Sequence, residues 1–333
     1  MRLSLFRLIT LLILGLLPMA FVQGQGCCSG GSPISGNLNI GAANSRSFSL
    51  NLTYDYNHLA DLVSGSKELD DKLRRRINHS VLLRVKYAFS DRLSLIALFN
   101  LIRQEERVRS TSPNAEDTFR KAEGVGDIIT VLQYQLWRAQ GHTLILAGGL
   151  KWPTGRTTIA DEETGIVLNP DLQPGTGSYD FTASLYYGME HWLFNGNRLN
   201  ATFTYRISSE AERFNGLQTY QFGDELFVDI GISFPVVLAK QLLYPEFSFR
   251  YRYQTEALND RAGAPNTGGH WLYATPGFRW AFNNRWSAFA FSEIPIYRNL
   301  VGVQLTTSYR VGAGIQYDIR FQDAEKEAKP QLF

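Results

Sequence analysis

The chain has 333 residues and balances 33 lysines and arginines against 31 aspartates and glutamates. The net charge of +2 argues against a dedicated nucleic-acid-binding protein. The hydrophobic fraction of 44% is ordinary, so hydropathy alone would not reveal a membrane protein, but 21 Phe, 16 Tyr and 6 Trp are a high aromatic content.

The first residues have the pattern of a secretory signal peptide. Arg2 and Arg7 give a basic start, residues 8–22 are apolar, and small residues follow at Gly24 and Gly26. The alternative is an N-terminal anchor helix. No later run approaches the roughly 18 apolar residues that a membrane-spanning helix requires.

Residues 25–46 are rich in Gly, Ser and Asn, so we expect a flexible periplasmic segment. It holds both cysteines, Cys27 and Cys28, and three interpretations stay open. Cys27 could carry a lipid anchor, although Gly24 and Gln25 fit the recognition sequence poorly. The two thiolates could bind a soft metal, although no His lies nearby. They could also form a vicinal disulfide or stay as exposed thiols in the oxidising periplasm.

From Ser47 to Phe321 the chain alternates apolar and polar side chains over segments of about ten residues. Phe203 and Tyr205, for example, alternate with Thr202 and Thr204. Strands with one apolar and one polar face suit a closed barrel in lipid. The pattern predicts an all-β fold, a transmembrane antiparallel β-barrel of about twelve strands of the outer-membrane type. We expect strands near 47–57, 80–90, 92–103, 126–137, 142–152, 179–193, 198–208, 223–234, 243–254, 270–282, 285–297 and 305–321.

Short and long connections alternate between these strands, as in outer-membrane barrels with tight periplasmic turns and longer extracellular loops. We therefore expect both termini in the periplasm and every long loop outside. Pro245, Pro276 and Pro295 lie inside expected strands, where we expect local distortion, and the mixed pattern of 285–297 predicts a bulge. The longer loops are expected near 58–79, 104–125, 153–178, 209–222, 255–269 and, shorter, 298–304.

Phe333 ends the chain, but residues 322–331 are charged and contain Lys329 and Pro330. We therefore expect Phe321 to end the last strand. The predicted organisation is a signal peptide at 1–24, a periplasmic segment at 25–46, the barrel at 47–321 and a charged tail at 322–333.

Three glycine-containing segments resemble a known family. They are Gly-Val-Gly-Asp at 124–127, Gly-Gly-Leu-Lys-Trp-Pro-Thr-Gly at 148–155 and Pro-Gly-Thr-Gly-Ser-Tyr-Asp at 174–180. Together they resemble the outer-membrane transporter family named for the phenol meta-cleavage degradation pathway, mainly over residues 120–235. The resemblance implies an outer-membrane barrel that passes small, sometimes aromatic, molecules, and it names no substrate.

The residues of these motifs also suit structural roles at the ends of barrel strands. Gly124 and Gly126 would allow a sharp turn into a strand, Asp127 would begin its lumen-facing parity, and Trp152 would face lipid. Lys151 would face the lumen, as a structural residue or as a ligand of the solute. A Gly-x-Gly without a third glycine and a following helix is a poor nucleotide loop, and we expect no cofactor.

The strand positions that are expected to face the lumen hold charges of both signs in near balance, so we expect many of these charges to pair across strands. The alternative is a path lined by Arg250, Arg252, Arg279 and Arg310 that favours small anions. The candidate lumen-lining residues are Arg84, Lys86, Asp127, Lys151, Arg206, Asp229, Glu246, Arg250, Arg252, Arg279, Arg310 and Arg320, with Asp55, Asp180, Glu190, Glu225 and Asp318 on the same parity.

The histidines do not assemble a recognisable catalytic motif. His79-Ser80 and His270 could in principle supply a nucleophile and a base, but no Gly-x-Ser-x-Gly or His-Glu-x-x-His occurs. We expect the histidines beside Trp192 and Trp271 to lie at the level of lipid headgroups. The chain is therefore predicted not to be an enzyme.

The sequence predicts a bacterial outer-membrane conduit for small, possibly aromatic, hydrophobic or anionic, molecules. Its expected partners are outer-membrane lipid, the barrel-assembly machinery and an unidentified solute, without nucleic acid. The alternative is a closed structural or docking barrel whose extracellular loops, especially 64–79, bind a partner.

Overall fold

A computed structural model describes residues 46–110, 112, 116–193, 196–238 and 241–321. The expected signal peptide, the segment with Cys27 and Cys28, and the tail from residue 322 lie outside these residues. Within the described ranges, no helix is long and apolar enough to cross a membrane.

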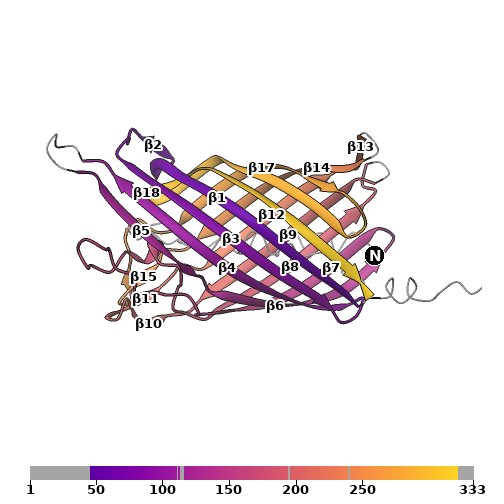
Figure 1. The fold of residues 1–333 in the computed structure, drawn as a ribbon, viewed down its shortest axis with the longest axis horizontal. Coiled ribbons are helices and arrows are strands. Elements are labelled where there is room, and N and C mark those ends of the chain that lie inside the picture. Colours follow the sequence, from indigo (N-terminus) through magenta and orange to yellow (C-terminus); the bar gives the residue numbers. More distant parts are fainter. Residues whose placement is uncertain (1–45, 111, 113–115, 194–195, 239–240, 322–333) are drawn as a thin grey trace, which may run out of the picture.

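Eleven strands form a closed antiparallel ring, shown from the side in Figure 1. Each pairs with its neighbour in the order β12-β9-β8-β7-β6-β4-β3-β1-β18-β17-β14, and a β12–β14 pairing closes the ring. The bounds are β1 (Ser47–Gly65), β3 (Arg74–Ala88), β4 (Leu93–Val108), β6 (Ile128–Ala139), β7 (His142–Trp152), β8 (Asp180–Glu190), β9 (Arg198–Ser208), β12 (Glu225–Ser233), β14 (Gln241–Gln254), β17 (Gly269–Ala281) and β18 (Trp286–Arg320).

The longest strand, β18, is folded back on itself. Its first arm pairs with β17 and its second arm pairs with β1, both antiparallel. Gly302 lies between the arms with φ 69°, and the N–H of Asp318 donates to the carbonyl of Arg285 at 2.8 Å across them. When the two arms of β18 are counted separately, twelve strand segments form the wall, which confirms the expected number.

The predicted β7 and β9 have the observed bounds, whereas several predicted loops are wrong. β1 continues to Gly65 and β3 begins at Arg74, so most of the expected 58–79 loop is strand. The expected 104–125 loop contains the end of β4 and the added strand β5 (Thr118–Val125). Two further short strands, β2 (Lys67–Leu69) and β13 (Val236–Leu238), pair with β1 and β14 outside the ring.

The expected loops 209–222 and 255–269 together form a second, four-stranded sheet. β11 pairs with β15, which joins two connections that are far apart in sequence. A small core that includes Phe214, Tyr220 and Phe222 packs beneath it. Its strands are β10 (Ala211–Phe214), β11 (Gln218–Gln221), β15 (Leu258–Asn259) and β16 (Ala262–Gly263).

The outer wall of the ring is apolar. The side chains of Leu132 and Leu146 are 50% and 49% exposed, on adjacent strands. Aromatic pairs lie near both ends of the wall, for example Trp286 with Tyr317 near the termini. The remaining exposed apolar side chains of the wall include Leu52, Val81, Leu95, Phe99, Phe181, Leu185, Phe203, Ile230, Phe249, Phe278, Val311 and Ile315.

The predicted distortion is confirmed at Pro295. Leu272 pairs with Tyr297 but the next residue, Tyr273, pairs with Pro295, so one residue is bulged. Pro245 instead stays in register opposite Phe278.

Candidate functional site

A continuous chain of charges crosses five adjacent strands inside the barrel. Lys151 on β7 lies 2.5 Å from Asp180 on β8, and Arg206 on β9 lies 3.7 Å from the same carboxylate. Arg206 also lies 2.6 Å from Glu225 on β12, which in turn lies 2.6 Å from Arg252 on β14. Strand register produces this chain, because Lys151 faces Asp180 and Arg206 faces Glu225 directly across the ladders.

A second chain of charges begins on β12 and β14, a few residues along from the first, and continues across β18 to β1. Asp229 on β12 lies 2.6 Å from Arg250 on β14, and Arg250 lies 2.5 Å from Glu293 on the first arm of β18. Arg310 on the second arm then bridges Glu293 at 2.9 Å and Asp55 on β1 at 2.7 Å. Glu293 was missing from the predicted set because it lies in the stretch of mixed alternation before the bulge.

These pairs change how the predicted arginine path is understood. Arg250, Arg252 and Arg310 each face a carboxylate at 2.9 Å or less, so their charge is largely compensated. Arg279 is less tightly held: its Nε lies 3.6 Å from Glu246, and Nη1 donates to the Gln316 side chain at 3.2 Å. The geometry favours the interpretation of these charges as mostly paired.

The connection at 153–178 folds into the barrel rather than extending away from it. Leu172 is fully buried and Gln173 is 1% exposed. Asp171, in the short 3-10 helix η1 (Pro170–Leu172), forms an ion pair with Arg76 of β3, which also contacts Glu106 of β4 at 2.7 Å. Arg76 belongs to the charged run that we considered as a docking loop, and its side chain instead faces this internal loop.

Asp127 holds both ends of this internal loop. Its Oδ1 accepts the N–H of Gly155 at 2.9 Å, and its Oδ2 accepts the N–H of Thr176 at 2.9 Å and its hydroxyl at 2.6 Å. The ammonium of Lys151 contacts the Thr176 hydroxyl and lies 3.6 Å from Asp127. Gly155 packs directly on Gly175, where an added Cβ would lie 2.5 Å from backbone.

The three glycine motifs therefore meet in space, but the predicted reason for the first was wrong. β5 and β6 both pair with β4 in the same direction, so Gly126 and Asp127 interrupt one strand rather than making a sharp turn. Gly124 and Gly126 leave room for the loop: an added Cβ would lie 3.4 Å from Pro174 at either position.

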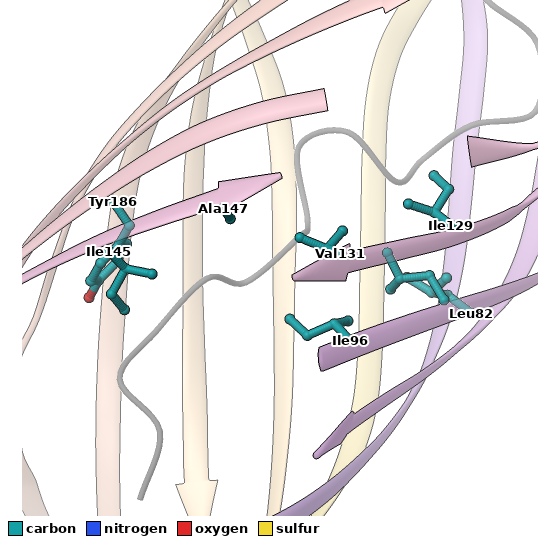
Figure 2. Close-up of a cluster of buried hydrophobic side chains, with 8 residues drawn as sticks. Leu82, Ile96, Ile129, Val131, Ile145, Ala147 and Tyr186 are labelled. Atoms are coloured by element: carbon teal, nitrogen blue, oxygen red, sulfur yellow. The ribbon is translucent and has the colours of Figure 1, made fainter. Parts of the chain in front are cut away.

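One wall of the lumen is apolar. Figure 2 shows its side chains on adjacent strands, from Leu82 on β3 to Tyr186 on β8. Ile96 is fully buried and Val131 is 1% exposed. On β6 and β7 both strand faces are apolar, and this explains why simple alternation weakens there. The strip comprises Leu82, Ile96, Leu98, Ile129, Val131, Ile145, Ala147 and Tyr186.

The half of the barrel nearer the termini encloses a cavity of about 1850 Å³. Among the described residues, eight cationic side chains and four carboxylates line it, which leaves an excess of positive charge. The cations are Arg84, Lys86, Arg138, Arg198, Arg250, Arg279, Arg285 and Arg320, and the carboxylates are Glu190, Asp229, Glu246 and Asp318. Three of these cations were not predicted: Arg138 near the end of β6, Arg198 at the start of β9 and Arg285 in a turn. They lie at strand ends and in a turn, where alternation no longer assigns a direction.

The two histidines considered as catalytic bases each contact a tyrosine hydroxyl. His79 Nδ1 lies 2.7 Å from the hydroxyl of Tyr54 and His270 Nδ1 lies 2.7 Å from that of Tyr251. Ser80 is 4% exposed and lies on the opposite face of β3 from His79. Trp271, beside His270, is fully buried and donates to Thr306 at 3.0 Å. The described residues contain no cluster of potential metal ligands.

The fold is similar to that of solved outer-membrane barrels. The structure of an outer membrane channel from Pseudomonas putida F1 superimposes with a TM-score of 0.65 at 12% identity, covering 85% of this chain and 98% of that one. The β domain of the Bordetella autotransporter BrkA gives 0.46 at 13% identity, covering 83% and 100%. Only the first of these TM-scores is high enough to support a shared topology. No family model and no curated protein matches the sequence.

Proposed function

We propose that this chain is an outer-membrane conduit for small anionic solutes. It would reach the outer membrane after secretion across the inner membrane. The closed ring with an apolar outer wall supports insertion into a bilayer, because such a wall needs lipid around it. We propose anionic solutes because cations outnumber carboxylates in the lining of the inner cavity of about 1850 Å³.

The internal loop held by Asp127 lies in the half of the barrel away from the termini, and it would limit the size of the solutes that pass. A ring of about twelve strands has a narrow interior, and this loop occupies part of it. The three glycine motifs that resemble the phenol meta-cleavage family meet at Asp127, and the proposed membership of that family rests on this resemblance. Lipid would contact the outer wall, and Phe321 at the end of β18 would be available to the assembly machinery.

Planar-bilayer recording tests the proposal. Reconstituted mature protein is expected to produce stable, resolvable conductance steps. Liposome swelling with acetate, benzoate and neutral benzyl alcohol would then rank solutes by charge. Electrical silence together with absence of swelling would contradict a conduit.

A docking barrel is the second candidate. The four-stranded sheet outside the ring has its own core, and Leu217 in its β10–β11 connection is 93% exposed. The separately packed sheet supports this candidate rather than Leu217 alone, because single exposed apolar side chains are common on protein surfaces. Electrical silence would favour this second function.

A further inference from the structure

Arg84 differs from every other strongly buried arginine of the described chain. Arg76, Arg84, Arg206 and Arg250 are each 7% exposed or less. Arg76, Arg206 and Arg250 contact carboxylates. Arg84 has no hydrogen bond or ion pair to any described residue. Burying a guanidinium without a partner is costly, so an unpartnered one indicates a role other than stability.

The position of Arg84 makes it accessible from the inner cavity. It lies on β3 opposite Asn51 of β1 and Leu98 of β4, and it lines the cavity. Asp318 also lines the cavity, where it accepts a hydrogen bond from Gln316 at 2.8 Å. Arg279 lies near Arg84 in the strand register, because its Nη1 donates to Gln316, which faces Asn51, and Asn51 faces Arg84.

Apolar surface adjoins this pair of cations. Leu82 precedes Arg84 on the same face of β3, and it lines the cavity together with Phe289 and Phe291. The guanidinium of Arg279 lies 5.4 Å from the centre of the Phe289 ring. That ring covers Gly314, where an added Cβ would lie 2.6 Å from it. Cations and apolar side chains therefore line one region of the cavity.

We propose that Arg84 and Arg279 bind the carboxylate of a small amphipathic acid whose apolar body lies against Leu82 and Phe289. A guanidinium presents a planar fork that matches a carboxylate, and a single ligand charge would compensate the unpartnered cation. This inference rests on the proposed function, because the solute enters through the lumen. It narrows the solutes from small anions to monocarboxylates with an apolar body.

Isothermal titration of the detergent-solubilised mature protein tests the site, with benzoate as the probe. Neutral benzyl alcohol and acetate serve as matched ligands that lack the charge or the ring. Benzoate is expected to bind at least about tenfold more tightly than either. Arg84→Gln is expected to weaken benzoate binding at least about tenfold, whereas Arg103→Gln, whose half-exposed side chain lies outside the cavity, is expected to change it less than about twofold. Equal binding of benzoate by Arg84→Gln, or of benzyl alcohol by the native protein, would overturn the proposal.

Two further readouts separate the possible causes of a negative result. Arg84→Gln removes a buried, unpartnered charge, so the barrel is expected to fold and to keep its heat-modifiable mobility on gels. Arg84→Lys keeps the charge without the fork and is expected to give intermediate affinity; native affinity in it would contradict carboxylate recognition by the fork. Benzoate binding without conductance would overturn the conduit alone, and conductance without benzoate binding would overturn the site alone.

Discussion

Lys151 and Asp180 face each other across β7 and β8, with Nζ 2.5 Å from Oδ2 and side chains only 2% and 0% exposed. This pair lies where the internal loop meets the wall, because Lys151 also contacts Thr176. Two buried charges at this distance depend on each other, since each would otherwise be a charge removed from water.

Removing one member of this pair is expected to be more harmful than removing both. Lys151→Met leaves Asp180 buried with less compensation and should lower the free energy of unfolding by about 3–5 kcal/mol. The double variant Lys151→Met/Asp180→Asn should recover part of that loss. Urea titration in lipid vesicles, followed by tryptophan fluorescence, measures both. Lys121→Met is the control, because its pair with Glu123 is exposed and should contribute less than about 1 kcal/mol; equal losses in the control and at Lys151 would contradict this account.

Asp127 is expected to control the position of the internal loop. Asp127→Ala removes the acceptor for the amides of Gly155 and Thr176, each worth about 1–3 kcal/mol when left unsatisfied. The loop should then be cut faster by trypsin at Arg156, which is exposed. Asp161→Ala is the matched control, because its carboxylate bonds only within the loop, to residues such as Thr164. Identical cleavage rates in both variants would show that Asp127 does not hold the loop.

The outer wall should tolerate charge less well than the lumen. Leu146→Arg places a charge on a side chain that is 49% exposed on the apolar wall, and should cost about 2–4 kcal/mol if it lies near the bilayer centre. Thr202→Arg, which lines the cavity, should cost much less. The folded fraction after refolding into vesicles, read from gel mobility, compares them. Equal folding would argue against lipid around this wall.

Most of the ring could be predicted because lipid and lumen impose alternation. β9 was predicted with its observed bounds since alternation begins directly after the Asn197 turn, and β7 because Gly141 and Pro153 flank it. Beyond the apolar belt that constraint ends, so the extension of β1 to Gly65 and the start of β3 at Arg74 were missed. β15 and β16 have two residues each, too few to show any period.

The sequence predicted which charged side chains face the lumen, but not which of them form ion pairs with each other. Parity correctly placed Arg84 and Arg250 on the inside. It could not show that Arg250 would lie between two carboxylates while Arg84 had none, because register and strand order across the closed ring decide which charges meet. The role of Asp127 depends on a loop 28 and 49 residues away in sequence, for which no local pattern exists.

The reversal potential of the reconstituted barrel across a tenfold KCl gradient tests the central claim most directly. The excess of cations in the inner cavity predicts a potential of the sign set by chloride, reduced in magnitude by Arg285→Gln/Arg320→Gln. The same change at Arg103 and Arg107, whose side chains are about half exposed outside the cavity, should leave it nearly unchanged. A potential of the sign set by potassium, or one that the cavity substitutions do not move, would contradict an anion-selective conduit.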